Sequence, residues 1–310
     1  MRIVIMGAGA MGGYYGARLV QAGHEVIFIA RGAHLEALLA QGLTVVRDEE
    51  RFTLHPIQAA DDPARFAPGG PAELVLFTTK AQDLEGAARS LLPLIGPRTV
   101  VLPLLNGVDI VERLGAVVGA ERVLAGLTYL PGNVPQPGVV NQPGAEHPLR
   151  FGEPAGGRSP RVEKLLAVFR NARIYCEASE DIRTDLWTKF VLINSTAGVC
   201  AVTRQTVGVV AADPDTRALY ESCARETAAL ARALGIQLPE DAVERTMAYL
   251  DKVPARNKPS MLQDLERGKP LELESLHGVV TRLGAERGMP TPVNRRIYAA
   301  LKLHVKGRRG

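Results

Sequence analysis

The chain has 310 residues, of which 46% are hydrophobic and 23% are charged, and its formal net charge is +4. These values are those of an ordinary soluble protein with room for two domains, each with its own core. The basic residues are dispersed without an aromatic platform, and the densest cluster, 306–309, is expected to be a solvated tail, so no nucleic acid is expected as a partner. No apolar stretch reaches the roughly 18 residues that span a bilayer, which argues against a membrane protein.

The cysteine and histidine residues exclude two further classes. Cys176, Cys200 and Cys223 are odd in number and lack the spacing of zinc ligands, and the six histidines are scattered. We therefore expect reduced thiols, a cytoplasmic location and no metal site. A secretory leader is not expected, because Arg2 is the single basic residue of the apolar N-terminus and the glycines there have another explanation.

Residues 1–16 carry the most informative motif. Residues 2–6 are apolar and predict a buried strand, and a helix is expected over 12–22. Between them lies the glycine loop, which consists of Gly7, Ala8, Gly9, Ala10, Met11 and Gly12. Glycines at this spacing allow a tight turn, a close approach of pyrophosphate and close packing of helix on strand, and the helix N-terminus attracts the phosphates. The sequence therefore predicts a dinucleotide site; the alternative is a tight turn in an α/β sheet.

The second predicted strand, 24–30, ends at a basic residue. A site for NAD has an acidic residue at this place, about 20 residues past the glycines, whereas this chain has Arg31. A guanidinium binds a 2′-phosphate through two charge-assisted hydrogen bonds, which favours NADP(H) over NAD(H). The alternative is a solvated Arg31, with His34 merely starting the next helix.

Further along, predicted strands alternate with helices up to residue 178. Two polar residues stand at strand ends: Lys80 follows the strand 72–79, and Asn106 follows the strand 98–105. Ligands of a doubly wound sheet bind at this edge, although an exposed loop lysine and an Asn-Gly turn are the simpler explanations of each. The other predicted elements of this half are a helix over 34–41, strands over 43–47, 51–57, 122–130, 149–153 and 173–178, a helix over 159–171 and a Pro/Gly-rich loop over 131–148.

Helical periodicity dominates beyond residue 179. Helices are expected over 181–202, 214–234, 240–250, 274–287 and 292–306. The predicted fold is therefore α/β, with an N-terminal Rossmann-like doubly wound sheet that binds NADP(H) over 1–178 and an all-helical domain with the substrate and catalytic residues over 179–310.

One lysine stands out in the helical half. Lys189 lies inside an otherwise apolar helix, where an unpaired ammonium is costly to desolvate. A lysine in a cleft can protonate a developing alkoxide, whereas the alternative is a lysine that reaches to solvent from the helix edge. Ser260 and Glu272 are unremarkable alone.

Together these residues resemble the ketopantoate reductase (2-dehydropantoate 2-reductase) family over essentially the whole chain. The resemblance is carried by GAGAMG at 7–12, Arg31, Thr79-Lys80-Ala81, Asn106-Gly107, Trp187-Thr188-Lys189, Ser260-Met261-Leu262-Gln263-Asp264 and Glu272.

The resemblance implies NADPH-dependent reduction of a small 2-oxo acid, with ketopantoate converted to pantoate on the route to pantothenate and coenzyme A. It further implies that Lys189 is the proton donor and that Asn106 contacts both cofactor and substrate. Ser260 is implied to contact the substrate, and Glu272 to contact the cofactor or support the lysine. Lys80 is assigned more weakly to the cofactor phosphates.

One departure from the family bears on the substrate. Members often carry asparagines four and eight residues after the lysine, where this chain has Ile193 and Ala197, and Asn194 is about 100° round the helix. Either ketopantoate is held by other groups, such as Ser260 and Arg204, or the substrate is a more apolar 2-oxo acid.

Two other functions remain open at this point. One is a related 3-hydroxyacid or opine-type dehydrogenase, and the other is a non-catalytic protein that senses NADP(H). The long apolar helices are also compatible with a homodimer interface, although the sequence does not determine the oligomeric state.

Overall fold

A computed structural model describes residues 1–144 and 147–307, so Arg308 and Arg309 of the basic tail lie outside the described residues. The chain forms two compact units. The first comprises Met1–Leu105 and Ile110–Ile182, and the second comprises Asn106–Asp109 and Arg183–Gly310. The predicted boundary at residue 179 did not anticipate that four residues following a strand of the first unit belong to the second.

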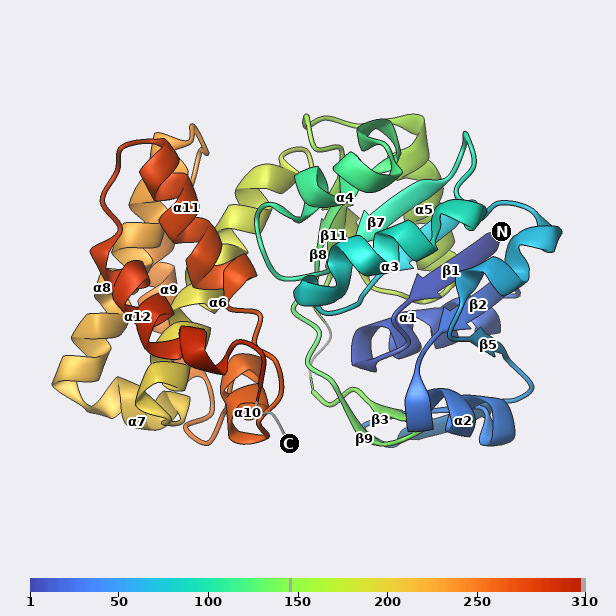
Figure 1. Cartoon of the computed structure of the whole chain (residues 1–310), viewed down its shortest axis with the longest axis horizontal. Coiled ribbons are helices and arrows are strands. Elements are labelled where there is room, and N and C mark those ends of the chain that lie inside the picture. Colours follow the sequence, from blue (N-terminus) through green and yellow to red (C-terminus); the bar gives the residue numbers. More distant parts are fainter. Residues whose placement is uncertain (145–146, 308–310) are drawn as a thin grey trace. The chain divides into compact units, whose positions relative to one another are not determined.

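The first unit is built on a parallel five-stranded sheet (Figure 1). Its strand order is β5-β2-β1-β6-β7, with bounds Gln58–Ala60, Glu25–Ile29, Arg2–Met6, Leu74–Phe77 and Val100–Pro103. In this order the chain reverses direction beside the first strand, as in doubly wound nucleotide-binding sheets. The predicted Rossmann-like architecture is therefore confirmed.

Alternate residues of β1 pack against helices on opposite faces of this sheet. Ile3 and Ile5 share a core with α1 (Ala10–Gln21) and α5 (Pro160–Asn171). Val4 and Met6 share another core with α3 (Leu84–Ser90) and α4 (Ile110–Val118). Because successive side chains of a strand point to opposite faces, a strand that is covered on both sides is apolar throughout.

Two smaller sheets complete the first unit. One has the order β4-β3-β10-β9 and the other β12-β11-β8. Their bounds are Glu50–Leu54, Leu43–Arg47, Val139–Asn141 and Asn133–Gln136 for the first, and Cys176–Ala178, Leu149–Gly152 and Ala125–Leu127 for the second; α2 spans Gly32–Gln41.

The prediction of a loop over 131–148 was therefore wrong for its first part. This segment holds β9 and β10, joined by a turn in which Gly138 has a φ of +77°. The strands are three or four residues long, and β9 contains a proline, so they are too short for the alternation of apolar residues to be visible. Residues 145 and 146 lie outside the described part of the chain.

The described part of the second unit contains helices and no strand, as predicted. Its helices are α6 (Ile182–Thr203), α7 (Val207–Ala212), α8 (Pro214–Ala233), α9 (Ala242–Lys252), α10 (Ser260–Glu266), α11 (Val279–Glu286) and α12 (Pro292–Leu301), with a π-helical turn at Glu274–Gly278 before α11. The sequence did not predict α7 and α10, because six or seven residues cover less than two helical turns.

Helix α6 is the longest element of the second unit. Contrary to the sequence-based expectation, it is long and apolar enough, by length and composition alone, to cross a membrane. However, 67% of its apolar window is buried within the protein. Val191 and Val199 have no exposed surface and pack in one cluster with Tyr220 of α8, so α6 has the burial of a core helix.

Candidate active site

The glycine loop connects β1 to α1, and two of its glycines leave no room for a side chain. Gly7 has a φ of +103°, and a Cβ there would lie 2.9 Å from the backbone nitrogen of Thr79. A Cβ at Gly12 would lie 2.2 Å from the carbonyl oxygen of Gly7. The loop is therefore folded tightly against the end of β6, where the Thr78 hydroxyl donates to the Gly7 carbonyl at 2.7 Å.

Gly9 is different, because a Cβ at this position would meet no atom within 4 Å. It is the N-cap of α1, it provides no side-chain cap, and the first turn of α1 has no acidic residue. The backbone N–H groups and the positive end of the helix dipole are thus presented beside open space. These features fit the pyrophosphate of a dinucleotide.

Arg31 and Lys80 lie at the same edge of the sheet as this loop. Arg31 is exposed at the N-cap of α2, just beyond β2, and Lys80 is exposed just beyond β6. Because β2 and β6 are the parallel neighbours of β1, both residues follow the carboxyl ends of strands that flank the loop. Two basic residues beside an anion-binding loop suit a phosphorylated cofactor.

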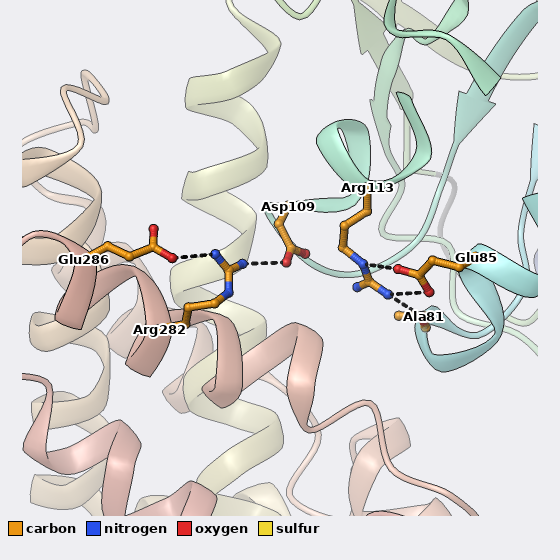
Figure 2. A network of polar contacts seen from close by, with 6 residues as sticks. All are labelled: Ala81, Glu85, Asp109, Arg113, Arg282 and Glu286. Atoms are coloured by element: carbon orange, nitrogen blue, oxygen red, sulfur yellow. Dashed lines mark hydrogen bonds and ion pairs between the residues drawn. The ribbon is translucent and has the colours of Figure 1, made fainter. Parts of the chain in front are cut away.

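The turn after Lys80 is held by an arginine from α4. Arg113 donates to the carbonyl oxygen of Ala81 at 3.0 Å and to Glu85 at 2.8 Å (Figure 2). This contact fixes the start of the segment that leads from β6 into α3.

In the second unit, Lys189 of α6 is buried beside Asn106. Lys189 is only 7% exposed, and its Nζ donates a hydrogen bond to Asn106 Oδ1 at 3.0 Å. Burial disfavours the ammonium and lowers the pKa of Lys189 to about 8, while the negative charge of Glu272 acts in the opposite direction. The structure therefore brings together three residues that the sequence analysis selected from distant segments.

Asn106 is held by the segment that carries it, which we call the anchor segment (Asn106–Asp109). Val108 packs against the apolar core of the helical unit. Asp109 Oδ2 accepts from Arg282 of α11 at 2.8 Å, and the same arginine donates to Glu286 at 3.1 Å (Figure 2). Sequence reasoning placed Asn106 at a strand end but missed Val108, Asp109 and Arg282, since their partners are distant in the sequence.

Asn194, the asparagine of α6, is buried within the second unit. It has no exposed surface, and its Nδ2 donates to Asn294 Oδ1 at 2.7 Å and to Thr227 Oγ1 at 3.1 Å. His277 lies 2.7 Å from the same Asn294 oxygen, and its burial lowers its pKa to about 4. Asn194 is therefore part of a buried polar network that joins α6, α8 and α12.

Two other candidate substrate contacts, Ser260 and Arg204, are not joined to Lys189 by the described contacts. Ser260 is exposed at the first residue of α10, and the described contacts do not connect it with Lys189. Arg204 is exposed just beyond the C-terminus of α6, roughly 20 Å along the helix from Lys189. That separation corrects the suggestion that Arg204 helps to hold a small substrate at the lysine.

The parallel sheet with its glycine loop has the architecture of dinucleotide-binding proteins. Two family models match it: "Ketopantoate reductase PanE/ApbA" over residues 3–156 and "Ketopantoate reductase PanE/ApbA C terminal" over residues 181–305. The chain belongs to the ketopantoate reductase family, whose members are NAD(P)H-dependent oxidoreductases acting on 2-oxo acids.

Individual relatives are similar to this chain over nearly its whole length. The 2-dehydropantoate 2-reductase of Mesorhizobium japonicum is 33% identical, with 97% of each chain covered, and that of Archaeoglobus fulgidus is 33% identical, with 95% of this chain and 94% of the relative covered. The crystal structure of a PanE/ApbA family ketopantoate reductase from Ralstonia eutropha matches with a TM-score of 0.90 at 32% identity, covering 98% of both chains. A D-mandelate dehydrogenase solved with NADH and anilino(oxo)acetate has a TM-score of 0.90 over 98% of both chains; at 22% identity it shows a shared fold.

Proposed function

We propose that the protein reduces a 2-oxo acid with NADPH, that 2-dehydropantoate is the preferred substrate, and that Lys189 is the proton donor. The observation that carries this proposal is the buried lysine amine, with Asn106 Oδ1 at 3.0 Å and a pKa of about 8. A pKa near the working pH suits a general acid, since the group is largely protonated and still gives up its proton readily. Membership of the family supports the reaction class.

The cofactor, when bound, supplies a hydride for the ketone carbon of the substrate. As charge develops on the ketone oxygen, the Lys189 ammonium stabilises it by a hydrogen bond and then donates its proton. Asn106 accepts one N–H of the ammonium and thereby orients the other two. Glu272 favours the charged form of the lysine, which keeps the donor protonated. Ser260 is proposed as a substrate contact on the family resemblance alone.

NADPH is proposed over NADH because Arg31 stands where NAD-binding proteins carry an acid. The test is to measure the affinity of both cofactors in Arg31→Asp, with Arg89→Asp as a control that changes the charge equally at an exposed position of α3. We expect Arg31→Asp to weaken NADPH much more than NADH. Equal losses for the two cofactors would refute the phosphate contact.

The substrate proposal is tested by NADPH oxidation with purified protein. The panel is ketopantoate, pyruvate, 2-oxoisovalerate, oxaloacetate and 3,3-dimethyl-2-oxobutanoate, which has the shape of ketopantoate without its hydroxyl group. A site that bonds the hydroxyl should prefer ketopantoate over this analogue by about 100-fold or more in kcat/KM. Lys189→Ala should abolish most turnover and leave NADPH binding intact; retained turnover would remove the lysine from the mechanism.

One observation favours a second candidate substrate. Ile193, one helical turn beyond Lys189, packs partly into the apolar core, and Ala197 is 7% exposed. Neither side chain can bond a hydroxyl group. If the hydroxyl-free analogue or 2-oxoisovalerate is reduced as well as ketopantoate, the protein is a reductase of more apolar 2-oxo acids. Activity confined to 3-hydroxyacids or opines would instead place it with those dehydrogenases, and NADPH binding without turnover would indicate a sensor.

A further inference from the structure

His34 of α2 contacts the glycine loop, which the sequence analysis did not anticipate. Its Nε2 lies 2.8 Å from the carbonyl oxygen of Ala8, and its Nδ1 lies 3.1 Å from the backbone nitrogen of Gly138. The imidazole thus joins the loop between β1 and α1 to the turn between β9 and β10. All three residues belong to the first unit.

The two contacts indicate which neutral tautomer of the ring fits its partners. A carbonyl oxygen only accepts, so Nε2 must carry the hydrogen that is donated to Ala8. A backbone N–H only donates, so Nδ1 must offer its lone pair to Gly138. The neutral tautomer protonated at Nε2 satisfies both partners, and the other neutral tautomer satisfies neither.

The Ala8 carbonyl belongs to the peptide group that enters Gly9. In a trans peptide the C=O and the following N–H point in opposite directions, so a hydrogen bond that holds the Ala8 oxygen also sets the direction of the Gly9 N–H. The other side of Ala8 is already fixed, because its N–H donates to the Ile29 carbonyl at 2.9 Å. His34 therefore holds the Ala8–Gly9 peptide, which lies between the Ala8 contact with β2 and the first turn of α1.

The hairpin that carries Gly138 is packed close to the glycine loop and to α1. A Cβ at Gly132, before β9, would lie 3.2 Å from the Ala10 side chain, and a Cβ at Gly13 would lie 2.6 Å from Val140 of β10. The Gly138 carbonyl accepts from Thr44 of β3 at 2.9 Å. The imidazole thus contacts a turn that is hydrogen-bonded to β3.

We propose that His34 is a positioning residue of the cofactor site, which orients the Ala8–Gly9 peptide so that its N–H is presented to the pyrophosphate. The inference rests on the proposed use of NADPH and on the fit of the glycine loop to a dinucleotide. It assigns to His34 an effect on pyrophosphate binding that does not extend to the adenosine 2′-phosphate.

Two substitutions separate the two hydrogen bonds. In His34→Gln the side-chain amide nitrogen can take the place of Nε2 and donate to Ala8. In His34→Asn the side-chain oxygen can take the place of Nδ1 and accept from Gly138, while the bond to Ala8 is lost. The measurements are the Kd of NADPH from its fluorescence, the Kd of 2′-AMP, which has no pyrophosphate, and thermal unfolding of the apoprotein.

We expect His34→Asn to weaken NADPH about tenfold and 2′-AMP less than twofold, and His34→Gln to bind NADPH within about twofold of wild type. Equal affinity of His34→Asn and wild type for NADPH would overturn the inference, and so would equal losses of both ligands. A merely structural histidine would lower the unfolding temperature of both variants and weaken both ligands together. If the wild-type protein binds no NADPH at all, the proposed function fails along with the inference.

A measurement on the wild-type protein complements the variants. The ¹⁵N shifts of the His34 ring distinguish the two neutral tautomers, and we expect protonation at Nε2. Protonation at Nδ1 would overturn the inference, because the ring could then donate nothing to Ala8.

Discussion

Replacing Lys189 by methionine should stabilise the protein while it removes the proposed acid. The pKa of Lys189 is lowered from 10.5 to about 8 by burial. Below pH 8 the lysine is charged in both the folded and the unfolded chain, and the difference in pKa corresponds to about 3 kcal/mol against folding. Methionine removes this cost and the hydrogen bond to Asn106, which contributes about 1 kcal/mol. The expected net gain at neutral pH is about 2 kcal/mol.

The difference in stability between the methionine variant and the wild type depends on pH. Between pH 8 and 10.5 the unfolded chain holds a proton that the folded chain has released, so the stability of the wild type rises with pH. The methionine variant lacks this contribution, so its advantage should disappear by about pH 10.5.

The assay is urea unfolding of the apoproteins at neutral pH and at about pH 10.5. Trp187, the single tryptophan of the chain, lies on α6 two residues before the lysine and reports on the helical unit. Lys252→Met, at an exposed position of α9, is the matched control and should change stability by less than about 0.5 kcal/mol. A destabilised Lys189→Met, or an advantage that is the same at both pH values, would refute the reasoning.

Three further predictions concern catalysis, the loop and the core. Because the acid must be protonated, kcat should fall as the pH rises through about 8. Glu272→Gln should move the midpoint of this pH–rate profile to lower pH, because the Glu272 charge raises the pKa of Lys189. An unmoved midpoint would exclude this effect of Glu272 on the lysine. Gly12→Ala should destabilise the protein by about 1–3 kcal/mol, since its Cβ would lie 2.2 Å from a carbonyl oxygen, whereas Gly9→Ala should unfold like wild type and bind NADPH more weakly. Calorimetry measures the stability of the two glycine variants, and titration measures their affinity for NADPH. Equal effects of both variants would contradict a packing role for Gly12 and a cofactor-binding role for Gly9. Asn194→Leu should cost about 2 kcal/mol or more, measured by urea unfolding, because its amide donates to two buried oxygen atoms; a neutral effect would show that the network is dispensable.

The sequence predicted the features that depend on local spacing. The glycine loop could be located because its turn, helix and strand are consecutive in the chain, and Arg31 and Lys80 could be placed at one sheet edge because parallel strands share their carboxyl ends. Contacts between segments that are distant in the sequence could not be predicted. The partner of Asn194 is 100 residues away in the sequence, and the contact of His34 with Gly138 spans 104 residues. No periodicity encodes such pairs.

The anchor segment has a practical consequence for anyone who wishes to dissect the protein. The polypeptide passes between the two units three times, after Leu105, after Asp109 and after Ile182. A fragment expressed from Arg183 onward would contain the lysine but lack its amide partner, and a fragment ending at Ile182 would carry that partner with no helix to receive it. The second unit is therefore encoded by two separate stretches of the gene, and exchanging it with that of a relative would need two grafts rather than one.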